Sequence, residues 1–335
     1  MTLHKEINFE LEICAHLATH GWLYADQDAA IYDRARALFP TDVIAWVQQT
    51  QPDAWKALAK NHGASAADTL LSRIRAQLDQ RGTLDVMRRG VEILGLRQPI
   101  KLAEFKPALG INPDILARYE ANRLRVVRQV RYSLHNENCI DVVLFLNGLP
   151  IATVELKTDF TQSVHDAIDQ YRFDRLPHPK GQAAEPLLSF PNGALVHFAV
   201  SNAEVHMVTR LDGPATVFLP FNQGDDGSAG NPRNPAGGHR TAYLWEQVWA
   251  RESWLEILGR YLIAQRDKKK QIEKVEAMLE AAWNTGAYTH TLSLLSLSSL
   301  FSLLLLSLSR ALSLSLLLSH QVLTPGDRKS TRLNS

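Results

Sequence analysis

Two carboxylates and an ammonium group lie within one apolar stretch, residues 138–160, NCIDVVLFLNGLPIATVELKTDF. Asp141 belongs to its first half and Glu155 and Lys157 to its second, with the dipeptide Asn147-Gly148 between the halves. Side chains alternate across a strand, so Glu155 and Lys157 share a face, and a turn centred near Gly148 brings Asp141 almost opposite Glu155. The three charged groups therefore converge at one end of a predicted hairpin.

This spacing favours metal-assisted phosphodiester chemistry. Carboxylates this close repel each other unless a cation lies between them. Mg²⁺ often takes one or two carboxylates together with water and substrate phosphate, and it can activate water for attack on a phosphodiester. Lys157 could orient or deprotonate that water, or stabilise developing negative charge. The simpler alternative is a surface Glu–Lys ion pair, but Asp141 and Glu155 lie in otherwise apolar strands, where a charge needs a partner or an ion.

The elements around this hairpin predict a mixed α/β fold. Asn-Gly between apolar runs is a strong hairpin signal. Alternation in residues 124–134 predicts a strand before the hairpin, and residues 161–172 predict a helix after it, with Val164, Ala167, Ile168 and Tyr171 on one face. Further strands are expected in ALVHFAVS, EVHMVTRL and TVFLPF, helices up to about residue 95, and a long helix over 241–264. The order predicts a mixed β-sheet flanked by helices.

Composition gives few further clues to function. The chain has 335 residues, 45% of them apolar and 21% charged, with a formal net charge of +1. No global charge field indicates a partner, so a nucleic-acid surface would have to be a local patch. Cys14 and Cys139 are too few for a disulfide framework and lie in apolar segments. Together with an N-terminus that has no signal-peptide pattern, they predict a reduced cytoplasmic protein with buried thiols.

The chain changes character after about residue 272. Between Leu292 and Ser319, 25 of 28 residues are Leu or Ser. The length would suffice for a membrane span, but ten serines and Arg310 weaken that hypothesis. The near-binary composition is typical of translated low-complexity DNA. We expect residues 1–272 to form the folded domain and residues 273–335 to be a non-native or disordered tail without a membrane role.

The hairpin, with Asp141 and Glu155-Leu156-Lys157, resembles the catalytic core of the PD-(D/E)xK nuclease superfamily. More narrowly, residues 5–272 resemble the N-terminal endonuclease domain of the R (restriction) subunit of type I restriction enzymes. Segments such as NGLPIATVELK, AIDQYRFDR and LVHFAVSNAEVHMVTRL occur in that family's order. The resemblance implies a restriction-endonuclease-like core in which Asp141 and Glu155 ligate Mg²⁺ and Lys157 is the catalytic lysine.

Two further site residues follow from the resemblance. Glu10, in NFELEICAHL, matches an acidic residue that such nucleases place near the metal, although Glu12 competes for the role. Gln170 matches a glutamine on the helix after the lysine that faces DNA. In the related pattern a tyrosine lies four residues further on, whereas here Tyr171 is adjacent and Asp174 holds the fourth position. A solvated helix glutamine is the alternative for Gln170.

Arginines in NRLRVVRQVRY are candidate phosphate contacts. Arg123, Arg125 and Arg131 share one side of the predicted strand, and Arg128 lies on the other. Such cations could neutralise phosphates without reading sequence. A solvated edge strand explains them equally well.

The resemblance also implies partners. They are double-stranded DNA and the modification and specificity subunits of a type I restriction complex. The family's R subunit also has an ATP-driven motor, which needs a G-x-x-x-x-G-K-[ST] loop. No Gly-Lys dipeptide occurs in this chain, so we expect ATP to act only through a motor outside it.

Two other functions stay open. The chain could be a catalytically incompetent fragment that docks DNA or partner subunits. It could also be a membrane-anchored protein that uses the Leu/Ser tail.

Overall fold

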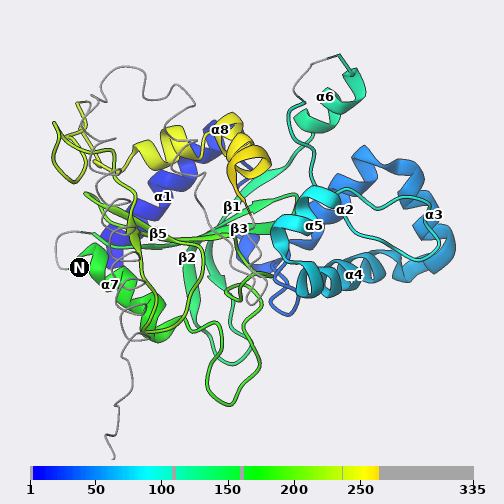
Figure 1. Cartoon of the computed structure of the whole chain (residues 1–335), viewed down its shortest axis with the longest axis horizontal. Helices are drawn as coiled ribbons and strands as arrows, with labels where there is room; N and C mark the ends of the chain where they lie inside the picture. The colour runs from blue at the N-terminus through cyan, green and yellow to red at the C-terminus, as the bar shows by residue number, and fades with distance from the viewer. Residues whose placement is uncertain (1–2, 108–110, 159–161, 236, 264–335) are drawn as a thin grey trace, which may run out of the picture. The chain divides into compact units, whose positions relative to one another are not determined.

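The computed structural model describes residues 3–107, 111–158, 162–235 and 237–263, all within one compact unit, residues 1–287. The predicted tail, residues 273–335, lies outside the described residues. In the described part, the strands form one six-stranded sheet in sequence order (Figure 1). They are β1 (Leu124–Arg131), β2 (Cys139–Leu146), β3 (Leu149–Leu156), β4 (Val196–Val200), β5 (Val205–Val208) and β6 (Leu219–Pro220).

The sheet is mixed, as predicted. Strands β1, β2 and β3 form an antiparallel meander, β4 runs parallel to β3, and β5 and β6 continue antiparallel. A parallel neighbour needs a crossover connection, and the chain between β3 and β4 supplies it with the helix α7 (Val164–Asp169). Because β3 and β4 are parallel, their carboxyl ends lie side by side, and Lys157 directly follows β3 at that edge of the sheet.

The β2–β3 turn explains why this hairpin forms where the sequence places it. Asn147 and Gly148 both have positive φ, 49° and 83°, which suits a two-residue turn between twisted strands. The Asn147 amide also donates hydrogen bonds to the Leu102 carbonyl at 2.9 Å and to Asn122 Oδ1 at 2.8 Å. The turn is thereby fixed both by its backbone and by the helical part of the chain.

Helices cover both faces of the sheet (Figure 1). Helix α1 (Leu3–Thr19) contributes Phe9, Ile13, Cys14 and Leu17 to one apolar core. Helix α7 contributes Val164, Ala167 and Ile168 to a second core, joined by Tyr171, so the apolar face predicted for residues 161–172 is confirmed. Ser163 caps α7, and Asp166 completes the capping box.

The amino-terminal half is mostly helical and packs into the same core as α1. Its helices are α2 (Pro40–Thr50), α3 (Pro52–His62), α4 (Ala66–Arg81), α5 (Thr83–Arg89) and α6 (Pro113–Glu120), with short 3₁₀ turns η1 (Asp28–Ala30) and η2 (Gly63–Ser65). Asp42 of α2 is fully buried and binds the guanidinium groups of Arg123 and Arg125, at 2.9 and 2.6 Å. This ion-pair cluster ties the helical half to the sheet.

The prediction of one continuous helix over residues 241–264 is wrong, because the helix is interrupted there. The chain forms a π-helical turn η4 (Leu244–Val248), the helix α8 (Arg251–Glu256) and a second π-helical turn η5 (Ile257–Tyr261). Ala250 is extended, with ψ 137°, and the Trp22 indole N–H donates to the Trp249 carbonyl at 3.0 Å. A tertiary hydrogen bond thus replaces a helical one at the break.

Two smaller expectations also need correction. TVFLPF yields only the two-residue strand β6, whose residues are exposed. Cys14 is fully buried as predicted, but Cys139 is half-buried and its thiol donates to Gln129 Oε1 at 3.2 Å. Within the described residues, no helix combines the length and the apolar character needed to cross a bilayer.

Candidate active site on the β2–β3 hairpin

Asp141 and Glu155 lie side by side on neighbouring strands. Val142 pairs with Val154, and the same register places Asp141 directly opposite Glu155. Asp141 Oδ2 accepts a hydrogen bond from the Leu156 N–H at 2.8 Å, which fixes its carboxylate against β3. Glu155 is 1% exposed, whereas Asp141 is partly open to solvent. The hairpin therefore presents a buried and an accessible carboxylate together.

Helix α1 adds a third carboxylate. Glu10 is buried, and the Gln129 amide donates to Glu10 Oε1 at 2.9 Å and to Asp141 Oδ1 at 3.3 Å. Arg128 binds Glu10 Oε2 at 2.9 Å from the same strand, β1. Glu10 rather than Glu12 thus lies at this site, since Glu12 instead faces His239 at 3.1 Å.

Lys157 follows β3 directly and is 5% exposed. Its backbone N–H donates to the Val200 carbonyl at 2.9 Å, which continues the β3–β4 pairing past the end of the strand. Its ammonium group lies 3.9 Å from Glu6 Oε1 on the first turn of α1. An ammonium group this buried needs a carboxylate partner to offset its lost solvation, and Glu6 supplies one.

Arg175 supplies the cation that neutralises Glu155. Its Nε donates to Glu155 Oε1 at 2.8 Å, and both side chains are largely buried. Arg175 follows a π-helical turn, η3 (Gln170–Asp174), that extends α7. The Arg175 N–H bonds to the Gln170 carbonyl at 2.8 Å, which closes this wider turn. Such turns inside helices occur frequently at functional sites.

Burial and mutual repulsion shift the acids at this site. Burial, followed by repulsion from Asp141, raises the pKa of Glu10 to about 7. The same two causes raise the pKa of Glu155 well above its usual range, although Arg175 opposes the shift. Burial also raises the pKa of Glu6, with Lys157 acting in the opposite direction. Four carboxylates thus face three cations, a set that a bound divalent cation would complement: Glu6, Glu10, Asp141 and Glu155 against Arg128, Lys157 and Arg175.

The predicted DNA-contacting arginines lie in different surroundings. Arg125 is bound by Asp42 and Asp28 and stacks on the Phe39 ring at 4.4 Å, so its charge is used within the fold. Arg123 shares Asp42 and is partly exposed. Arg131 is 63% exposed and pairs with Glu137 at 2.9 Å. Of these three side chains, Arg131 is the most accessible to a ligand.

Gln170 opens the π-helical turn before Arg175. Its side-chain oxygen Oε1 is buried and has no hydrogen-bond partner among the described residues. The predicted DNA contact of Gln170 stays a prediction.

Sequence patterns did not indicate the residues whose side chains contact the site carboxylates and Lys157. Glu6 and Gln129 had no signal that separated them from solvated polar residues. Alternation along the strand predicts Arg128 on the side opposite the other arginines, and in the structure that side reaches Glu10. Arg175 could have been suspected because a buried Glu155 demands a cation, but its position depends on the π-helical turn.

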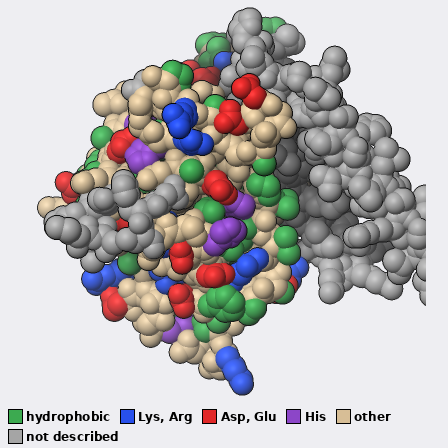
Figure 2. Space-filling model, turned by 90° about the vertical axis from the view of Figure 1, so that its left-hand side faces the viewer, with side chains coloured by type: hydrophobic (Ala, Val, Ile, Leu, Met, Phe, Trp, Pro, Cys, Tyr) green, Lys and Arg blue, Asp and Glu red, His purple; other side chains and the backbone are tan. Residues whose placement is uncertain are grey.

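The surface around these elements carries both signs of charge. Figure 2 shows acidic, basic and histidine side chains interspersed on one face of the molecule. That face is not a uniformly basic surface, so any DNA contact there would rest on individual cations.

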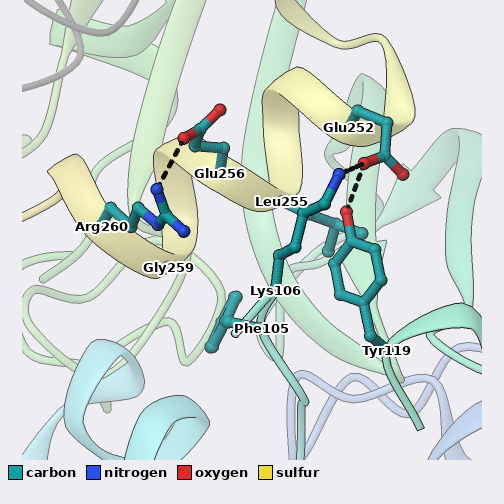
Figure 3. Close-up of a pocket in the computed structure, with 8 residues that line it drawn as sticks. All are labelled: Phe105, Lys106, Tyr119, Glu252, Leu255, Glu256, Gly259 and Arg260. Carbon is teal, nitrogen blue, oxygen red and sulfur yellow. Dashed lines mark hydrogen bonds and ion pairs between the residues drawn. The ribbon is translucent and has the colours of Figure 1, made fainter. Parts of the chain in front are cut away.

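A separate hollow lies between α6, α8 and the loop before α6 (Figure 3). Glu252 accepts hydrogen bonds from the Tyr119 hydroxyl at 2.8 Å and from Lys106 Nζ at 3.2 Å. Arg260 pairs with Glu256 at 3.2 Å on the helical side. These contacts connect neighbouring elements, and none of them involves the hairpin carboxylates.

The hairpin residues fit Mg²⁺ in a restricted sense. Within the described ranges, no group of three or more His, Cys, Asp or Glu side chains is arranged to hold a metal ion. Mg²⁺ needs only one or two carboxylates when water and substrate phosphates complete its octahedron. Asp141 and Glu155 are adjacent oxygen donors, and Asp141 is open to solvent. Asp141 and Glu155 therefore meet the minimum number of carboxylates for Mg²⁺, and further oxygen ligands would have to complete the shell.

Comparison with known protein families places this site in context. Residues 11–216 match the family described as "Type I restriction enzyme R protein N terminus", more than half of the chain. The chain belongs to this family. The matched range contains the hairpin, α7 and Arg175 but begins after Glu6 and Glu10. A search of curated proteins found no match. Together with the mixed sheet, the match confirms the resemblance drawn from the hairpin and its neighbouring segments.

Proposed function

We propose that this R-protein N-terminal domain is a Mg²⁺-dependent endonuclease that hydrolyses DNA phosphodiester bonds. The observation that carries the proposal is the convergence of Asp141, Glu155, Lys157 and Glu10 at one end of the β2–β3 hairpin. These groups come from different elements, and burying their charges costs free energy unless a partner or a bound ion compensates.

The roles divide between holding the metal and handling the water. Asp141 and Glu155 would hold Mg²⁺, which supplies charge neutralisation at the phosphate and acidifies a bound water. Lys157 would orient the attacking water or stabilise negative charge on the phosphate. Glu10 would add a third carboxylate beside the metal, because the Gln129 amide donates hydrogen bonds to both Glu10 and Asp141.

Partners follow from the family. We infer that the domain acts on double-stranded DNA in the cytoplasm, within a complex with modification and specificity subunits, and that ATP enters only through a motor outside this chain. Arg131 is the best placed of the predicted arginines for a phosphate contact, because it is exposed and its partner Glu137 is exposed as well.

The first experiment is a calorimetric titration of Mn²⁺ into the full chain, with Asp141→Ala beside it. A matched control is Asp169→Ala, because Asp169 is an exposed carboxylate on α7. We expect saturable binding in the wild-type chain and in Asp169→Ala, and loss of binding in Asp141→Ala.

Equal behaviour of all three proteins would overturn a metal site at the hairpin on protein ligands alone. The titration would then be repeated with a non-hydrolysable DNA duplex present. Failure there too would leave a fragment that docks DNA or partner subunits without cleaving as the better account.

A further inference from the structure

Arg175 lies against the buried carboxylate of the candidate site, although its place in the sequence gives no sign of it. It contacts Glu155 Oε1 at 2.8 Å, and the side chains of Arg175 and Glu155 are 13% and 1% exposed. The donor atom in this contact is Arg175 Nε. A charge-assisted hydrogen bond to one carboxylate oxygen restricts the rotation of the carboxylate and leaves Oε2 outside this contact.

The π-helical turn explains how Arg175 reaches the strand. Thr153 and Glu155 are two residues apart on β3 and share a face, about 6.5 Å apart at strand geometry. Tyr171 lies within the π-helical turn, and Arg175 follows the turn with the non-helical angles φ −111° and ψ 54°. The contacts pair the two sets of residues, because the Tyr171 hydroxyl lies 2.8 Å from the Thr153 hydroxyl and Arg175 Nε lies 2.8 Å from Glu155 Oε1.

A buried hydrogen-bond network anchors this match. The Thr153 hydroxyl is 2.8 Å from the Tyr171 hydroxyl and 2.7 Å from His197 Nδ1, and all three residues are fully buried. His197 lies on β4 directly beside Thr153. The network fixes the start of the π-helical turn on the sheet, so Arg175 at its end has little freedom to move.

We propose that Arg175 is a positioning residue that holds Glu155 in the orientation needed to ligate the metal. This inference rests on the proposed function and deepens it. In this role Arg175 acts through its contact with Glu155 and does not itself ligate the metal. Partners of this kind orient metal ligands, and their loss typically weakens metal binding about 10- to 100-fold.

The test compares Mn²⁺ affinity, measured by calorimetry, across variants of the full chain. Arg175→Met removes the charge and the hydrogen bond but keeps the apolar stem, and Arg175→Lys keeps the charge. The matched control is Arg172→Met in the same turn, whose Nε donates to the Thr216 carbonyl at 3.0 Å, away from the site. We expect about 10- to 100-fold weaker binding in Arg175→Met, partial recovery in Arg175→Lys and wild-type affinity in Arg172→Met.

The opposite result identifies competition instead of positioning. If Arg175 competes with the metal for Glu155, Arg175→Met will bind Mn²⁺ as tightly as the wild type or more tightly, and the proposal is overturned. If Arg175→Met does not fold, Arg175→Lys decides alone, since wild-type affinity in that variant would remove any need for the guanidinium geometry.

A second measurement separates this proposal from the proposed function. Urea unfolding of Arg175→Met, Glu155→Gln and the double variant, all without metal, measures the coupling between the two side chains. We expect strong non-additivity, and additive effects would overturn the positioning role. Absence of Mn²⁺ binding in the wild-type chain would instead count against the metal site, while the unfolding cycle would still decide whether Arg175 holds Glu155.

Discussion

At the scale of single residues, Lys157 gives the most direct test of chemistry. We expect Lys157→Ala to lower DNA cleavage in the reconstituted complex by about 10²- to 10⁴-fold, because a positioned proton-transfer or charge-stabilising group contributes that much. Mn²⁺ binding should persist, since Asp141 and Glu155 remain. Plasmid nicking and calorimetry measure the two effects, with Lys180→Ala, an exposed loop lysine, as the control. Undiminished cleavage in Lys157→Ala would assign the chemistry to another group.

Gln129 is the strained residue of the site. It has φ 49° within β1 while its amide bridges Glu10 and Asp141. A left-handed conformation costs a non-glycine residue about 1–2 kcal/mol, and such strain concentrates at functional sites. We expect Gln129→Ala to lower the free energy of unfolding, because alanine loses the hydrogen bonds to Glu10 and Asp141 but keeps the left-handed backbone conformation. Gln129→Gly should be about 1 kcal/mol more stable than Gln129→Ala. Urea denaturation decides, and an alanine variant at least as stable as the glycine variant would argue against strain.

At the scale of elements, the β2–β3 turn has no room for a side chain at Gly148. A Cβ there would lie 2.5 Å from the Phe39 carbonyl oxygen and 2.5 Å from Val43 Cγ2, at a φ of 83°. Strain and overpacking together predict that Gly148→Ala lowers the free energy of unfolding by about 2–5 kcal/mol. Gly181→Ala is the matched control, because Gly181 has φ 74° but open space around it. Gly181→Ala should lower the free energy of unfolding only by the cost of the left-handed backbone. Similar losses of stability in both variants would exclude a clash of the Gly148→Ala methyl group with Phe39 and Val43.

The buried histidine of β4 predicts a pH dependence of stability. Burial lowers the pKa of His197 from 6.5 to about 3. The unfolded chain therefore takes up a proton below pH 6.5 that the folded chain refuses, and stability falls as the pH falls from 6.5 toward 3. Between pH 7 and pH 5 this residue should cost about 2 kcal/mol. Urea unfolding at both pH values should show a smaller fall in His197→Gln, and identical falls would contradict a neutral buried His197.

The elements that the sequence predicted well are those with local signals. The Asn147-Gly148 turn, the alternating strands and the apolar face of α7 are each encoded within a few neighbouring residues. The same local reading gave one continuous helix where the chain breaks at Ala250, because the break depends on Trp22, more than two hundred residues away. Asp141 and Glu155 could be paired from hairpin geometry, whereas Gln129 and Arg175 required the left-handed residue and the π-helical turn, which leave no recognisable pattern in the sequence.

At the scale of the whole molecule, Asp42 joins the helical half to the sheet. It is fully buried and pairs with both Arg123 and Arg125, so its loss removes the carboxylate of Arg123 and leaves Arg125 with Asp28 alone. We expect Asp42→Ala to lower the free energy of unfolding by about 3–5 kcal/mol. Asp53→Ala, at an exposed helix position, should change it little. Urea denaturation measures both free energies. A small effect of Asp42→Ala would contradict a structural role for these ion pairs and would favour the predicted DNA contact of Arg123 and Arg125.

The packing of α1 has a consequence for how the site can be observed. Phe9 lies edge-on to Trp245 with ring centroids 5.7 Å apart, one residue before Glu10. The Trp22 indole, which follows the same helix, is bonded to Trp249. Several native fluorophores therefore report on the seam between α1 and the η4–α8 segment. Release of α1 would move Glu6 and Glu10 away from Lys157 and Asp141. The same event would change the surroundings of these indoles and shift their fluorescence emission. Tryptophan fluorescence would therefore report whether Glu6 and Glu10 are in place at the candidate site.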